Sequence, residues 1–225
     1  MSAPSCFRLP KILLPRGGID LRKWAVIACD QYTSEPGYWE KVAREVGDAP
    51  STLNLIFPEV NLGAADATSR IRRIQDTMRS YLSNRVFDER DGAIYVERTL
   101  GNRIRRGLML ELDLEQYDFT SKSASPIRPT EGTMVERLAP RIEVRRGAEL
   151  ELPHILVLID DPERTVIESL AGERRALTKL YETDLMLGGG RVAGYAVDAP
   201  RGGRVTKALQ APASPSAFAK RYRVA

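Results

Sequence analysis

Ala93-Ile-Tyr-Val-Glu-Arg-Thr99 and the run Arg-Arg-Gly-Leu-Met-Leu-Glu-Leu-Asp-Leu at 105–114 lie on either side of Gly101-Asn102. Two such runs around a glycine-asparagine turn are typical of a β-hairpin. In the second run leucines alternate with Met109, Glu111 and Asp113, as expected for a strand with one buried and one solvated face. The pattern therefore predicts two antiparallel strands.

Two helices are predicted before this hairpin. The first begins at Ser34-Glu35-Pro36, where serine can cap the helix and proline suits its first turn. Its apolar face comprises Tyr38, Trp39, Val42 and Val46. The second covers residues 66–84, and its apolar residues recur at helical spacing: Ile71, Ile74, Met78 and Leu82. Both segments are therefore expected to bury one face against strands.

Short apolar runs predict further strands at 23–30, 54–58, 141–145, 152–162 and 192–197. The run at 152–162, Leu-Pro-His-Ile-Leu-Val-Leu-Ile-Asp-Asp-Pro, gives the strongest prediction of a buried strand. A helix is expected to follow it from Asp161-Pro-Glu163, and another around Leu177 and Leu180. This mixture of a hairpin and strand–helix steps predicts an α/β or α+β fold, with a mixed sheet and flanking helices.

The charge distribution separates a body from a tail. Of the 34 lysines and arginines, six lie in 199–225, which contains no acidic residue, so the net charge of +4 comes from this segment. We expect a family domain at 1–198 and a disordered basic tail at 199–225. Six charges in a disordered tail do not predict specific nucleic-acid binding.

Location is predicted from what the sequence lacks. No window approaches the ~18 apolar residues of a membrane span, and residues 1–10 have no apolar core like that of a signal peptide. Two cysteines and no export signal fit a reduced cytoplasm. The sequence therefore predicts a cytoplasmic protein with no membrane partner.

The central stretch, Ser125-Pro-Ile-Arg-Pro-Thr-Glu-Gly-Thr-Met-Val-Glu-Arg-Leu-Ala-Pro-Arg141, is rich in groups that bind phosphate or move protons. Arginine forks and hydroxyls beside a glycine suit a phosphate ligand. The candidate ligand-binding residues are Arg128, Thr130, Thr133, Glu136 and Arg137. Glu131 is a candidate general base or metal ligand. The alternative is structural, because Thr133 to Glu136 matches a helix capping box.

Carboxylates follow two of the predicted strands. Asp30 is a candidate catalytic residue and Asp160 a candidate ligand-binding residue, because sites in open sheets gather beyond the strand ends. Asp161 is assigned instead to capping the next helix. His154, the single histidine, is expected to be a core residue. Gly188-Gly-Gly190 lacks the lysine and serine of a phosphate loop, which favours a flexible connection.

Several blocks of this sequence resemble the family called domain of unknown function 1015. They are Trp24-Ala-Val-Ile-Ala-Cys-Asp-Gln-Tyr-Thr-Ser-Glu-Pro36, Pro50-Ser-Thr-Leu-Asn-Leu-Ile-Phe-Pro-Glu-Val60, Ile127-Arg-Pro-Thr-Glu-Gly-Thr133 with Glu136-Arg137, Leu152-Pro-His-Ile155 with Leu158-Ile-Asp-Asp-Pro162, and Leu187-Gly-Gly-Gly190. Family members are typically near twice this length and carry a later Gly-Asp-Gly-Asn-His type motif, which this chain lacks. The resemblance implies the front half of a longer protein, truncated and inactive alone.

The same resemblance implies a function. The family's later motif is similar to one in the ParB-like superfamily, which includes CTP-hydrolysing partition proteins and free-serine kinases. By that similarity Arg128, Glu131, Glu136 and Arg137 look like the element that binds nucleotide and acceptor. The first hypothesis is a nucleotide-dependent small-molecule phosphotransferase that uses Mg²⁺ with ADP or ATP. The alternative is a non-enzymatic regulatory module that binds a nucleotide or another small ligand.

Overall fold

The computed structural model describes residues 6–28, 32, 34–118, 120, 125, 127, 135, 138–152 and 154–209. Its main sheet has four strands in the order β5-β4-β8-β7: β4 (Ala93–Leu100), β5 (Arg103–Met109), β7 (Lys179–Asp184) and β8 (Arg191–Val197). The hairpin predicted from the sequence is confirmed, because β4 and β5 are antiparallel and join through Gly101 and Asn102. Gly101 has a φ of 59°, which suits glycine in a tight turn.

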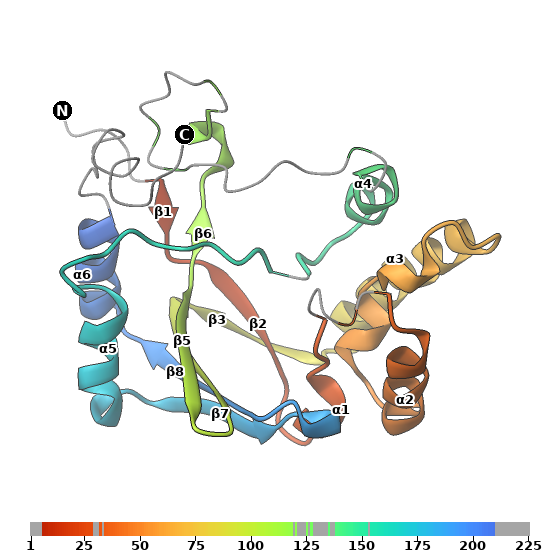
Figure 1. Cartoon of the computed structure of the whole chain (residues 1–225), viewed down its shortest axis with the longest axis horizontal. Coiled ribbons are helices and arrows are strands. Elements are labelled where there is room, and N and C mark those ends of the chain that lie inside the picture. Colours follow the sequence, from red (N-terminus) through yellow and green to blue (C-terminus); the bar gives the residue numbers. More distant parts are fainter. Residues whose placement is uncertain are drawn as a thin grey trace.

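Helices α5 (Ile167–Glu173) and α6 (Ala199–Leu209) pack beside this sheet (Figure 1). Arg201 and Arg204 of α6 form ion pairs with Glu173 of α5. The core that these helices share with the sheet consists of Ala93, Tyr95, Val166, Leu170, Leu177, Ala193, Tyr195, Val197 and Val205. One half of one sheet face is therefore apolar and covered.

A second group of helices lies at the other side of the molecule (Figure 1): α1 (Leu21–Trp24), α2 (Pro36–Val46) and α3 (Ala67–Ser83). Both helices predicted before the hairpin are confirmed. The predicted apolar face of α2 is buried, and Gly47 ends this helix. In α3, Ile74 and Met78 are buried against Trp24 and Leu55.

The remaining elements are short or pair locally. Strand β1 (Phe7–Arg8) pairs with β6 (Glu111–Leu112), and β2 (Lys11–Pro15) pairs with β3 (Phe87–Asp91), both antiparallel. The other helical elements are η2 (Thr52–Leu55), η3 (Glu59–Asn61), η4 (Leu114–Gln116), α4 (Leu138–Arg146), η6 (Arg174–Ala176) and η7 (Met186–Gly188). The predicted combination of a sheet with flanking helices is confirmed, but the expected mixed sheet is not, because the pairings between described strands are all antiparallel. No described helix is long and apolar enough to cross a membrane.

Several predicted elements are wrong in type. Within 23–30, α1 ends at Trp24 and the described residues that follow form no strand, although Trp24 and Ile27 are buried. The run at 54–58 overlaps η2, and 141–145 belongs to α4. The expected helix around Leu180 is β7 instead, because this segment pairs with β8. Each of these segments is short, so neighbouring elements decided between helix and strand.

Two larger expectations also differ from the structure. The run at 152–162 forms no strand in its described residues, and His154 is exposed. Residues 199–209, placed in a disordered tail, form α6, whose Val205 is buried in the core. The few apolar residues of α6 lie on one face of the helix. The prediction missed this helix because the segment is rich in proline, glycine and arginine. Residues 210–225 lie outside the described part of the chain.

Candidate functional site

The structure describes one of the residues chosen as a site from the sequence. Asp160 is half-buried, between the apolar run and Asp161. The others lie outside the described residues: Asp30, Arg128, Thr130, Glu131, Thr133, Glu136 and Arg137. The capping box at Thr133 lies outside them too, and α4 begins at Leu138. Their roles therefore stay predictions, and the site must be built from other residues.

Asp161 forms hydrogen bonds with the turn that precedes α5. Its carboxylate accepts hydrogen bonds from the backbone N–H of Thr165 at 3.0 Å and of Val166 at 2.7 Å. Partial burial alone would raise the pKa of Asp161, but these hydrogen bonds outweigh burial, and the pKa lies below its ordinary value. The predicted capping role is wrong in this respect: Asp161 fixes the turn before α5, whereas the N-cap of α5 is Val166 and has no side-chain capping hydrogen bond.

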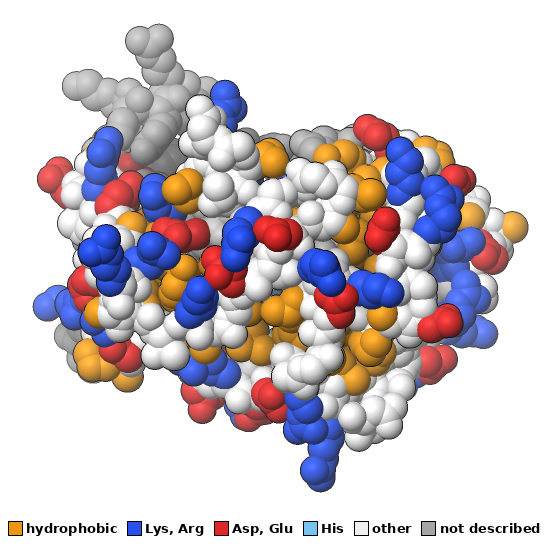
Figure 2. All heavy atoms as spheres, turned by 90° about the horizontal axis from the view of Figure 1, so that it is seen from below, with side chains coloured by type: hydrophobic (Ala, Val, Ile, Leu, Met, Phe, Trp, Pro, Cys, Tyr) orange, Lys and Arg blue, Asp and Glu red, His pale blue; other side chains and the backbone are white. Residues whose placement is uncertain are grey.

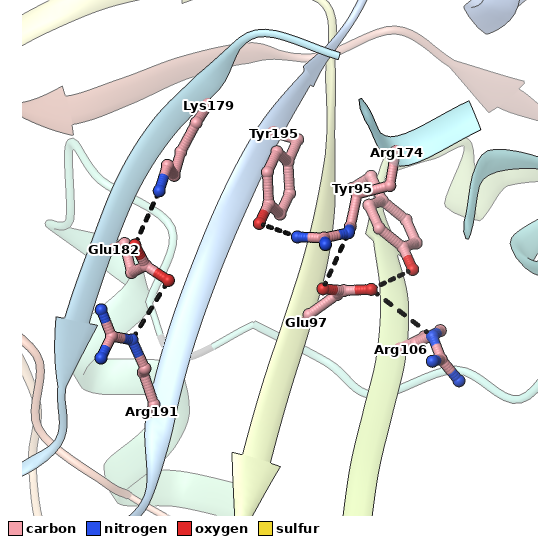
Figure 3. A network of polar contacts seen from close by, with 8 residues as sticks. All are labelled: Tyr95, Glu97, Arg106, Arg174, Lys179, Glu182, Arg191 and Tyr195. Carbon is pink, nitrogen blue, oxygen red and sulfur yellow. Dashed lines mark hydrogen bonds and ion pairs between the residues drawn. The ribbon is translucent and has the colours of Figure 1, made fainter. Parts of the chain in front are cut away.

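The most developed polar cluster surrounds Glu97, on the same sheet face as the covered core (Figure 3). Register places Glu97 opposite Arg106, and Tyr95 opposite Tyr195. The Glu97 carboxylate accepts a hydrogen bond from the Tyr95 hydroxyl at 2.9 Å and lies 3.5 Å from Arg106 Nε. Arg174, from η6, approaches its other oxygen at 3.7 Å. One carboxylate therefore holds two guanidinium groups and a phenol.

Arg174 is fixed from a second direction. Its Nη1 donates to the Tyr195 hydroxyl at 2.8 Å, and its guanidinium carbon lies 5.6 Å from the centre of that ring. The hydrogen bond with Tyr195 and the charge of Glu97 both raise the pKa of Arg174. Burial, the hydrogen bond with Glu97 and the charge of Glu97 raise the pKa of Tyr95. Tyr95 therefore stays neutral at physiological pH, and the hydroxyls of both tyrosines act as hydrogen-bonding supports.

A similar but more exposed arrangement lies beside it on β7 and β8 (Figure 3). Glu182 accepts from Lys179 at 2.7 Å and from Arg191 at 3.1 Å. Together, Glu97 and Glu182 are bracketed by four basic side chains, so this group of residues carries a net positive charge. Seen from below, the protein shows both signs of charge interspersed with hydrophobic side chains (Figure 2), and not a continuous basic face.

The Glu97 cluster borders a hollow of about 310 Å³. The residues that line it are Ile104, Arg106, Ile159, Asp161, Ile167 and Glu168. Arg106 therefore belongs to both the cluster and the hollow, and its side chain is 41% exposed. Ile104 and Arg106 come from the edge strand β5, and Asp161 and Glu168 add two carboxylates to the lining of the hollow. The hollow thus combines apolar walls with groups of both charges.

This set of groups can bind a phosphate together with a cation. Each arginine has five N–H donors, and Glu97 engages only part of those on Arg106 and Arg174. Among the described residues no group of three or more acidic, histidine or cysteine side chains could hold a metal ion. Mg²⁺ is commonly held by one or two carboxylates together with the phosphates of its ligand. Asp161 and Glu168 fit that pattern only when a phosphate supplies the remaining oxygens.

The glycine run beside the sheet is a packing device. Gly190 has a φ of 87°, and a Cβ there would lie 2.1 Å from the carbonyl oxygen of Thr99. Arg98 donates two hydrogen bonds to the carbonyl of Gly189, at 2.9 and 3.2 Å. Leu185 N–H donates to the Gly190 carbonyl at 2.7 Å. The run is therefore a tight connection between β7 and β8, and the prediction of a flexible connection is wrong in this respect.

The sequence contained a signal for the Glu97 cluster that composition did not reveal. A two-residue turn at Gly101-Asn102 pairs Leu100 with Arg103, and counting outward pairs Glu97 with Arg106. Opposite charges facing each other across a hairpin are favourable. Arg174 gave no such signal, because it reaches the sheet from η6 through tertiary packing.

Comparison with known proteins gives one finding. A family model described as Protein of unknown function (DUF1015) matches residues 13–215. The match extends beyond residue 198, where the family domain was expected to end, and includes all of α6. No curated protein and no solved structure matches the chain.

Proposed function

The chain belongs to the DUF1015 family of proteins of unknown function, and we propose that it binds a small phosphate-bearing ligand, of the nucleotide class, with Mg²⁺. The observation that carries this proposal is the position of Arg106, which joins the Glu97 cluster to the hollow. There it meets the carboxylates of Asp161 and Glu168 across apolar walls. Guanidinium groups suit phosphate oxygens, and carboxylates suit the accompanying cation.

The fixed position of these arginines supports binding. Glu97 is well shielded, with its side chain 14% exposed, while Arg106 and Arg174 are 41% and 44% exposed. A shielded carboxylate that holds two half-exposed guanidinium groups lowers the ordering cost of binding, because both side chains are already positioned. The apolar Ile104, Ile159 and Ile167 would contact the base or another uncharged part of the ligand.

A nucleotide-dependent phosphotransferase is the second candidate, and it rests on the sequence. In that proposal Glu131 deprotonates an acceptor hydroxyl, with Asp30 as a further catalytic group. Arg128 and Arg137 would hold the phosphates, and the other ligand-binding residues would be Thr130, Thr133, Glu136 and Asp160. What supports it is the density of these residue types and the resemblance to ParB-like and free-serine-kinase proteins. The remaining alternative is a non-enzymatic regulatory module, which would bind the same ligand without turnover.

The binding proposal is tested with Mg²⁺ and ATP, ADP or inorganic phosphate, by thermal shift and calorimetry. We expect ligand to raise the melting temperature of the 225-residue chain, because binding to the folded state stabilises it. Arg106→Ala should weaken binding about tenfold or more, since a charge-assisted contact is lost. Arg85→Ala, in an exposed arginine away from the hollow, is the control and should bind normally. No shift with any of the three ligands at millimolar concentration would reject the proposal.

Glu131→Ala then separates enzyme from binding module. If the chain transfers phosphate, this variant should keep its affinity and lose turnover, because the base acts only in the reaction. If no acceptor is phosphorylated by the unaltered chain while nucleotide binds, the binding module is favoured.

A further inference from the structure

The most apolar run of the chain is exposed. Residues 155–159 read Ile-Leu-Val-Leu-Ile, and Ile155, Leu156 and Leu158 are 72%, 76% and 79% exposed. Within the described part of the chain, the backbone of these residues makes no hydrogen bond. Adjacent exposed large apolar side chains mark an interaction surface more often than a single exposed one does. The β-branched and leucine side chains of this run also suit a strand.

The main sheet has an end strand with an available edge. Strand β5 is last in the order β5-β4-β8-β7, and no described strand pairs with its outer side. Arg103, Ile104 and Arg105 on this strand are all exposed, with Ile104 at 47%. An unpaired edge presents backbone N–H and C=O groups that can accept another strand.

The exposed run and the edge of β5 are complementary in charge. The run is flanked by Glu149 and Glu151 on one side and by Asp160 and Asp161 on the other. The edge strand carries Arg103, Arg105 and Arg106 around Ile104. Their lengths also match, since a five-residue run is an ordinary strand length and β5 has seven residues. One chain therefore carries both a segment that could be added as a strand and a sheet edge that could accept it.

These two halves cannot pair readily within one chain. Asp161 is tied to the entrance of α5 by hydrogen bonds to Thr165 and Val166. Ile159 packs against the core beneath α5. The run thus passes from α4 to α5 across the molecule (Figure 1), and only its end, at Ile159 and Asp161, lies near Ile104 and Arg106 of β5. Pairing with its own β5 would break the hydrogen bonds of Asp161, whereas pairing with a second copy leaves them in place.

We propose that this surface is for a second copy of the chain. In the dimer, residues 155–159 of each copy add as a strand to the outer edge of β5 in the other, and the exposed Glu149 and Glu151 meet the arginines of β5. Exchange in both directions makes the contact closed and symmetric. It buries the exposed leucines and pairs the backbone of both elements. The assembly does not depend on the proposed ligand.

Sedimentation equilibrium of the 225-residue chain over a range of concentrations tests the dimer. We expect reversible dimerisation, and the double variant Leu156→Asp with Leu158→Asp should raise the dissociation constant about tenfold or more, as loss of central apolar contacts does. Leu114→Asp, at a leucine 62% exposed outside the proposed surface, is the control and should still dimerise. A chain that stays monomeric, or a double variant that dimerises normally, would overturn the proposal.

A mixing experiment tests the exchange itself, with folding of each variant checked by circular dichroism. One variant has the run broken by Leu156→Asp and Leu158→Asp, and the other has the edge reversed by Arg103→Glu and Arg105→Glu. Neither should dimerise alone. Mixed together they should form a heterodimer, because the intact run of the second can pair with the intact edge of the first. Absence of a heterodimer from two folded variants would contradict the exchange.

Discussion

Strand β8 and the run at 155–159 are both apolar, yet they have opposite environments. Strand β8 lies between β4 and β7, and Ala193, Tyr195 and Val197 are buried in the core. The run at 155–159 has the larger side chains, but residues 155–158 are exposed and the run is unpaired among the described residues. Apolar composition determines how much burial would stabilise a segment. Whether burial happens depends on a neighbour with a compatible surface.

The side chains of β8 show why this strand fits the interior of a sheet. A Cβ at Gly194 would lie 2.2 Å from the ring of Tyr181, so only glycine leaves room for that tyrosine. Burial raises the pKa of Tyr181 to about 12. The small residues Ala193, Gly194 and Ala196 thus lie on either side of Tyr195 in β8. The run at 155–159 has a large side chain at every position, so a strand there needs cover on both faces.

The largest expected difference between these regions comes from placing the same charge in each. Val197→Asp should cost about 4 kcal/mol or more of unfolding free energy, because Val197 is 1% exposed and the carboxylate has no partner there. Leu156→Asp should change it by about 0.5 kcal/mol or less at concentrations where the chain is monomeric. Urea unfolding followed by circular dichroism measures both. Equal losses would show that 155–159 is buried in solution.

A smaller effect is expected in the connection that leads into β8. Gly190→Ala should cost about 2–4 kcal/mol, because it adds a left-handed backbone penalty to a clash with the Thr99 carbonyl. Gly203→Ala in α6 is the matched control, since a Cβ there has nothing within 4 Å. It should stabilise the helix by about 0.5–1 kcal/mol. Similar melting temperatures for both variants would mean that the connection is not tightly packed.

The smallest effect concerns the end of the exposed run, where Asp161 enters α5. Its pKa is below the ordinary value in the folded chain, so its carboxylate stabilises the fold above about pH 4 and this contribution is lost as the pH falls through the folded pKa. Asp161→Ala should cost about 1 kcal/mol at neutral pH through loss of its hydrogen bonds with Thr165 and Val166.

Asp161→Asn keeps an acceptor oxygen but cannot titrate, so this variant separates the effect of the charge from the effect of the hydrogen bonds. Its unfolding free energy should decline less than that of the unaltered chain between about pH 6 and about pH 2.5. Urea unfolding at the two pH values measures this difference. Parallel declines would show that Asp161 does not titrate differently in the folded chain.

Local patterns predicted much of the fold and little of the candidate site. The hairpin, α2 and α3 follow from a turn signal and from helical spacing, which neighbouring residues specify. The segments around Leu180 and Arg141 were assigned wrongly, because β7 needs β8 beside it and α4 has only one buried residue, Val144. The site chosen from the sequence lies mostly outside the described residues, whereas the described cluster depends on Arg174.

The sequence by itself determined the mixed fold class, the hairpin register that pairs Glu97 with Arg106, and the apolar faces of α2 and α3. These depend on residues a few positions apart, whose geometry the backbone imposes. Only the tertiary structure decided that Arg174 and Tyr195 meet at Glu97, that 199–209 is a packed helix, and that β8 is buried while 155–159 is exposed. These outcomes depend on contacts between segments distant in sequence, and a local pattern does not specify which segments will pack against each other.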